Sequence, residues 1–188
     1  MKKQITIAAL FSLFSCIASA HPGHGLDSAY TGFIHPFTGW DHLLVMLAIG
    51  VWAAKLGGKA RWQLPLTFIV TMAVGALLGL SGLNLAGIET AIAASVMAMG
   101  VLLMISLPIN KVTQLSLTAA FALLHGLAHG VELQPQSSLA ALGGMLAATA
   151  ILHSLGLLMA SQHAKITYWF NSLFACLLLF VGSYLLLS

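Results

Sequence analysis

The chain has 188 residues, of which 60% are hydrophobic and only 6% are charged. A soluble domain carries about 25% charged residues, so this composition excludes an ordinary soluble domain and a disordered chain alike. The formal net charge of +3 includes only seven Lys and Arg, which form no basic patch of the kind that binds nucleic acid. We therefore expect a membrane protein whose partners include the lipid bilayer but no nucleic acid.

Residues 1–20 have the organisation of a secretory signal peptide. Two lysines follow Met1, residues 5–16 form a short apolar run, and residues 18–20 are Ala-Ser-Ala, a small-x-small cleavage site. Cleavage after Ala20 would make His21 the first residue of the mature chain. We therefore expect two parts, a signal peptide at 1–20 and a single transmembrane domain at 21–188.

The cysteines also limit what kind of site the chain can build. Cys16 and Cys176 are the two cysteines of the sequence. A lipoprotein signal would be cut before Cys16, but Phe14 is too bulky for a typical site of that kind. Once Cys16 is removed, neither a disulfide nor a thiolate metal site can form within the mature chain. Any metal must then be held by His, Asp, Glu, Met or backbone groups.

The rest of the chain is a series of apolar segments separated by turn-forming residues. A helix needs about 20 mostly apolar residues to cross a membrane. We expect such helices at residues 37–54, 62–80, 89–107, 112–131, 139–161 and 168–187. The predicted fold is therefore an all-α membrane protein, a bundle of six transmembrane helices.

Basic residues predict the orientation of this bundle. They follow the first, third and fifth segments, at Lys55, Lys59, Arg61, Lys111 and Lys165. The positive-inside rule makes their side cytoplasmic, and a cleaved signal peptide independently places the mature N-terminus outside. We therefore expect a multi-pass protein of the bacterial inner membrane with both mature termini outside.

Ionisable residues are concentrated at the predicted outer ends of these helices. His35 lies just before the first segment, Asp41 and His42 lie in its outer turns, and Glu89 begins the third segment on the same side. Imidazole and carboxylate groups are costly in a bilayer, so they usually mark a path or a site. Asp41 either ligates a metal or accepts the proton of a ligating histidine.

The fourth segment adds a stripe of polar groups at the same level. His125, His129 and Glu132 are spaced i, i+4 and i+7, which places them on one face of a helix. Two imidazoles at i and i+4 can bind one metal ion, and imidazole with carboxylate suits a divalent transition metal. The sequence therefore predicts a shared metal site built from three helices.

Three further histidines lie away from this level. His153 lies about 21 Å from the outer end of the fifth segment, at about 1.5 Å per residue. It is a second ligand station, a proton relay, or a buried histidine bonded to a backbone carbonyl. His21 and His24, with a free α-amine, would capture metal outside the membrane, or they belong to a plain flexible terminus.

These residues resemble the HupE/UreJ family of membrane proteins. The resemblance rests on the signal peptide, the start HPGH at 21–24, the pattern HPxxGxDHxxxM at 35–46 and the pattern HGxxHGxE at 125–132. It implies a nickel or cobalt permease that supplies hydrogenase or urease. It also implies that His35, Asp41 and His42 form the metal-selecting motif of the first helix.

We therefore expect a permease rather than an enzyme, with nickel as its most favoured cargo and cobalt as the next. No permanent cofactor is expected, and proteins of metalloenzyme maturation are expected partners. One alternative is an intramembrane zinc hydrolase, with His125, His129 and His153 as ligands and Glu132 or Asp41 as the base. A second alternative is a membrane accessory protein that binds metal without transporting it. The sequence carries no signal for an oligomeric state.

Overall fold

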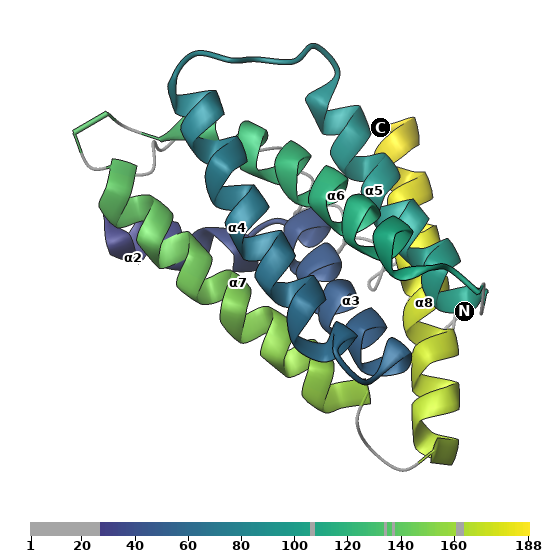
Figure 1. Cartoon of the computed structure of the whole chain (residues 1–188). Coiled ribbons are helices and arrows are strands. Elements are labelled where there is room, and N and C mark those ends of the chain that lie inside the picture. Colours follow the sequence, from purple (N-terminus) through teal and green to yellow (C-terminus); the bar gives the residue numbers. More distant parts are fainter. Residues whose placement is uncertain (1–26, 106–107, 134, 137, 161–163) are drawn as a thin grey trace, which may run out of the picture.

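The computed structural model describes residues 27–188 except 106–107, 134, 137 and 161–163 (Figure 1). The predicted signal peptide and the pair His21 and His24 lie outside the described residues. Within them the regular elements are helices, in agreement with the predicted all-α fold. In chain order they are α2 (Ala29–Ile34), η1 (His35–Phe37), α3 (Trp40–Leu56), α4 (Ala60–Leu80), α5 (Ile88–Met104), α6 (Lys111–Glu132), α7 (Ser138–Ala160) and α8 (Ala164–Leu187).

The predicted apolar segments correspond to α3 through α8, but they differ in their ability to span a membrane. Three helices are long and apolar enough, namely α4, α7 and residues Trp169–Leu187 of α8, and the bent pair of α2–η1 and α3 makes up to four. With 17 residues, α5 is shorter than the roughly 20 residues that a membrane span needs. The hydropathy of α6 is reduced by its own His125, His129 and Glu132. The molecule is thus a helical membrane protein, and the number of six spans stays a prediction.

The helices pack in pairs that are distant in sequence. α4 packs along α6, α3 along α7, and α5 along α8, while α2 packs on the beginning of α7. Figure 1 shows α5 and α8 on one side of the bundle and α7 with α2 on the opposite side. The core between them is built from apolar side chains of α3 through α8, with the buried alanine Ala122 from α6.

The contact between α4 and α6 depends on glycines. A Cβ atom on Gly126 would collide with the carbonyl oxygen of Met72, and one on Gly130 would collide with that of Ala76. Small residues allow helix backbones to approach closely in membrane proteins. Because Met72 pairs with Gly126 and Ala76 with Gly130, the two helices run parallel, and α6 ends where α4 ends.

The two short helices before α3 were not predicted from the sequence. α2 and η1 meet α3 at an angle of 80°. Pro36 occupies the first turn of η1, a position where its missing N–H costs nothing. Gly39 then caps α3, and a Cβ atom there would lie only 2.7 Å from Asp41 Oδ1. The bend places the side chain of His35 over the end of the bundle.

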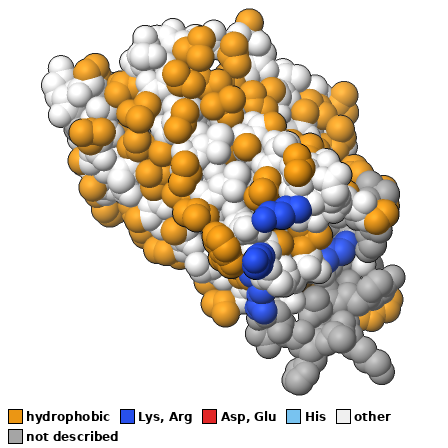
Figure 2. Space-filling view, viewed as in Figure 1, with side chains coloured by type: hydrophobic (Ala, Val, Ile, Leu, Met, Phe, Trp, Pro, Cys, Tyr) orange, Lys and Arg blue, Asp and Glu red, His pale blue; other side chains and the backbone are white. Residues whose placement is uncertain are grey.

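Basic residues gather at the other end of the bundle. Lys55, Lys59 and Arg61 surround the turn between α3 and α4, and Lys111 begins α6, which runs parallel to α4. Lys55 Nζ donates to the carbonyl oxygen of Leu103 near the end of α5 at 2.7 Å. Figure 2 shows Lys and Arg confined to one end of a surface that is otherwise rich in hydrophobic side chains. This matches the grouping of cations expected for a cytoplasmic side.

Candidate metal centre

The bundle end opposite to the basic residues holds a cluster of imidazole and carboxylate groups. Its members come from η1, from the first turn of α3 and from the last turns of α6, so they are joined by folding rather than by sequence. We call them the outer cluster, made of His35, Asp41, His42, His125, His129 and Glu132.

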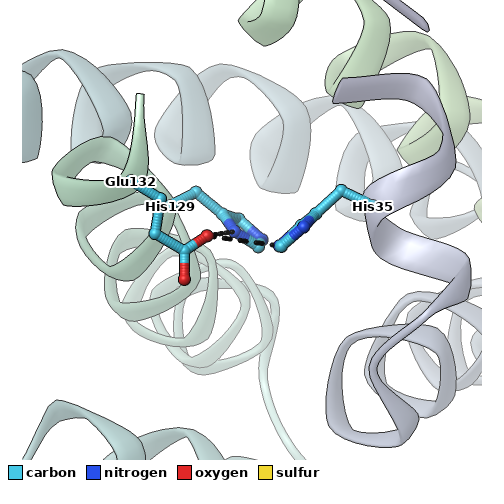
Figure 3. Close-up of side chains that lie close together, drawn as sticks. All are labelled: His35, His129 and Glu132. Carbon is cyan, nitrogen blue, oxygen red and sulfur yellow. Dashed lines mark ion pairs between the residues drawn. The ribbon is translucent and has the colours of Figure 1, made fainter. Parts of the chain in front are cut away.

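Glu132 lies between two of the imidazoles. Its Oε2 atom lies 3.4 Å from His35 Nε2 and 3.7 Å from His129 Nδ1. One ligand atom from each of these three residues lies within 4.8 Å of the others, and Figure 3 shows the three side chains pointing toward one another. Because ligand atoms sit at about 2.1 Å from a bound ion, a small contraction would bring all three onto one ion.

The remaining imidazoles continue this group into the bundle. The ring of His42 lies 4.3 Å from the ring of His129 and 5.0 Å from the ring of His125, measured between centroids. His42 is 2% exposed, and His125 and His129 are fully buried. The i, i+4 stripe on α6 therefore faces the first turn of α3, as the sequence predicted.

Hydrogen bonds determine which nitrogen carries the proton in two of these rings. Asp41 Oδ1 lies 2.6 Å from His42 Nδ1 and also accepts the backbone N–H of His42 at 2.8 Å. A carboxylate can only accept, so the proton sits on Nδ1 and the lone pair of the neutral ring sits on Nε2. Asp41 is thus placed to orient a ligand and raise its basicity rather than to ligate directly.

His125 has the same arrangement with a different acceptor. Its Nδ1 donates to the carbonyl oxygen of Phe121 at 2.9 Å, which again leaves the lone pair on Nε2. That Nε2 atom is buried and has no hydrogen-bond partner among the described residues. A buried lone pair without a partner is costly unless it binds something, so His125 fits the role of a metal ligand.

Two predicted site residues lie apart from this cluster. Glu89 is exposed at the start of α5, at the same end of the bundle. His153 lies deeper, where its Nδ1 donates to the carbonyl oxygen of Met46 at 2.7 Å. Ring contacts link Phe68 both to His125 and to His153, at 5.9 and 5.0 Å. The three imidazoles of the hydrolase hypothesis therefore do not gather in one group.

Several residues beside the cluster were not predicted. Phe68 is fully buried against two imidazoles. The hydroxyl of Thr149 donates to the sulfur of Met46 at 3.0 Å and lies 3.8 Å from the sulfur of Met72. In the sequence Phe68 and Thr149 look like ordinary core residues of apolar helices. The one sequence feature that pointed to this region was Met46, which lies one helical turn after His42.

The whole chain is similar to known proteins. The HupE / UreJ protein family matches residues 8–185. Protein HupE from Rhizobium leguminosarum bv. viciae is 43% identical over 157 residues, which cover 83% of this chain and 81% of the relative. No solved structure matches the chain. Because the family match includes η1, α3 and α6 with the whole outer cluster, the chain belongs to the HupE/UreJ family.

Proposed function

We propose that this protein is a permease that carries a divalent transition metal, nickel first and cobalt second, inward across the bacterial inner membrane. One observation carries the proposal. Imidazoles and a carboxylate from segments about ninety residues apart converge, largely buried, in a bundle of apolar helices. Buried ionisable groups in membrane helices usually serve ions or protons.

The proposed orientation puts the outer cluster toward the cell exterior. All four acidic residues, Asp27, Asp41, Glu89 and Glu132, lie toward this end, while the lysines and arginine of the α3–α4 turn lie at the other. We include six spanning helices, a cleaved signal peptide and both mature termini outside in the proposal. His21 and His24 would collect the ion before it reaches the cluster.

The proposed cluster chemistry is the replacement of water by ligands. Moving even a monovalent ion into a medium of dielectric constant near 4 costs on the order of 20 kcal/mol. His35, His129 and Glu132 would replace the first waters, and the Nε2 atoms of His42 and His125 would take the ion deeper. Glu132 and Asp41 offset the double positive charge, and Glu89 raises the local cation concentration. The ion delivered would supply the maturation of a hydrogenase or urease.

Nickel influx into liposomes tests this proposal. The mature protein is reconstituted in vesicles that hold a metal-sensitive dye, and nickel, cobalt and zinc are added separately. We expect influx that is lost in His42→Ala and kept in Thr118→Ala. Thr118 is a matched control because it is buried on α6, and its hydroxyl donates to the Gln114 carbonyl of its own helix. Equal influx in His42→Ala and the wild type would sink the assignment.

A zinc hydrolase is the second candidate, and one observation favours it. His35, His129 and Glu132 form a His₂Glu set, which is also found in catalytic zinc sites with one open position. Tightly bound stoichiometric zinc, without flux of any ion, would support this enzyme. Binding of nickel without flux would instead support an accessory protein.

A further inference from the structure

His153 is a buried imidazole that the outer cluster does not use. It is 1% exposed in the middle of α7. Its Nδ1 donates to the carbonyl oxygen of Met46 at 2.7 Å, and because a carbonyl can only accept, the lone pair of the neutral ring sits on Nε2. That Nε2 atom is buried without a hydrogen-bond partner among the described residues. Such a group in a native structure calls for a physical explanation.

His125 has the same hydrogen-bonding arrangement, and both histidines contact Phe68. In both histidines a backbone carbonyl holds the proton on Nδ1 and leaves Nε2 open. The Phe68 ring lies 5.9 Å from the ring of His125 and 5.0 Å from that of His153, and its side chain is fully buried. Two imidazoles, each with an open Nε2 atom, thus contact the same aromatic ring.

Depth explains why a second ligand is needed. His153 follows Ser138, the first residue of α7, by fifteen residues, or about 22 Å at about 1.5 Å per residue. The hydrocarbon core of a bilayer is about 30 Å thick. Without a ligand at His153, an ion that left the outer cluster would cross most of the hydrocarbon core without meeting an imidazole or a carboxylate.

The other deep polar side chains do not fill this gap. Among the fully buried ones that the structure describes, Ser95 and Thr118 donate to carbonyls of their own helices, and Thr149 donates to the sulfur of Met46. Among the fully buried side chains that the structure describes, only His153 combines such depth with an open nitrogen lone pair. The sulfurs of Met46 and Met72 lie near Thr149, where they offer weak thioether contacts.

We propose that His153 Nε2 is a second metal station, which receives the divalent ion from the outer cluster. This inference rests on the proposed transport function. The station has no carboxylate, because all four acidic residues lie toward the outer end. It therefore holds a 2+ ion more weakly than the outer cluster does. Conduction requires such a site, which accepts the ion yet releases it.

A pair of amide variants separates ligation from packing. His153→Asn keeps an N–H near the position of Nδ1 for the Met46 carbonyl and removes the ligand atom. His153→Gln places an amide oxygen near the position of Nε2. Ser154→Ala is the control, since Ser154 is an exposed neighbour that donates to the Ala150 carbonyl of its own helix.

We expect His153→Asn to reduce nickel influx about tenfold or more, while nickel binding at the outer cluster stays within about twofold of the wild type. His153→Gln should recover part of the influx, and Ser154→Ala should keep all of it. Undiminished influx in His153→Asn would overturn the proposal. So would loss of binding together with influx, because His153 would then be only a structural support.

A second measurement does not depend on transport. Solubilised protein is titrated with ¹¹³Cd²⁺ and followed by cadmium NMR. We expect two bound signals, one lost in His42→Asn and the other lost in His153→Asn. A single signal that is insensitive to His153→Asn would contradict the second station. If both signals appear but no ion crosses the liposome membrane, the permease proposal fails and the second station stands.

Discussion

Replacing Asp41 by Asn removes a charge while preserving the shape of the outer cluster. Asp41 Oδ1 lies 2.6 Å from His42 Nδ1 and accepts the backbone N–H of the same residue. An Asn oxygen can accept both hydrogen bonds, so α3 should still begin at Trp40. What changes is the negative charge behind the imidazole that we expect to bind metal.

The size of this effect follows from the geometry. An ion bound to His42 Nε2 at about 2.1 Å would lie roughly 6 Å from Asp41 Oδ1, across the ring. For a 2+ ion and an effective dielectric constant near 20, the Coulomb attraction is about 5 kcal/mol. This figure is an upper limit, because an amide dipole replaces part of the attraction and the ligand bond itself survives. Loss of such a partner typically weakens metal binding about 10–100-fold, or roughly 1.4–2.7 kcal/mol.

Equilibrium dialysis with nickel at pH 7.5 measures this change. Asp27→Asn is the matched control, because it removes the same charge from an exposed residue at the same end of the bundle. We expect Asp41→Asn to weaken nickel binding within the range above and Asp27→Asn to leave it unchanged. Equal affinities for Asp41→Asn and the wild type would refute the role of Asp41. Equal losses in both variants would show a diffuse charge effect instead.

Further predictions concern pH, packing and topology. Nickel binding should be complete above about pH 7 and should fall as the pH drops below about 6, because protons compete for the imidazole lone pairs. A titration that is flat to pH 5 would contradict this prediction. Gly126→Val should lower the thermal unfolding midpoint, because the added Cβ would collide with the Met72 carbonyl. The expected loss in the free energy of unfolding is about 1–3 kcal/mol. Gly143→Ala should have little effect, because a Cβ there meets open space. Gly58→Cys and Ser81→Cys, each with Cys176 replaced by Ser, test the orientation in intact spheroplasts. An impermeant thiol reagent should label the cysteine at position 81 and should not reach the one at position 58. The opposite pattern would reverse the proposed orientation.

Most of the fold was predictable because hydropathy and turns carry it. The predicted segment at 62–80 corresponds to α4 (Ala60–Leu80), and the preceding turn contains Gly57 and Gly58, both at positive φ. α2 and η1 were missed because helices of six and three residues show no hydrophobic period. The pairing of α4 with α6 was also not predicted, because a face of small residues indicates a close helix contact but not which helix makes it.

The site was predictable where helix geometry alone decides it. The stripe of His125, His129 and Glu132 follows from their spacing, and the structure places it against His42. The separate roles of Asp41 and His42 depend on which atoms hydrogen-bond, which no spacing reveals. The contacts of Phe68 with two imidazoles depend on how α4 packs against α6 and α7, and this is a property of the folded bundle.

X-ray absorption at the nickel edge shows whether the outer cluster exchanges the water of the ion for imidazole and carboxylate. Nickel bound to the solubilised protein should show imidazole scattering and nitrogen or oxygen ligands at about 2.1 Å, and His42→Ala should lower the imidazole contribution. A nickel ion that keeps a complete shell of water, or a spectrum unchanged by His42→Ala, would show that the outer cluster does not bind the ion as proposed.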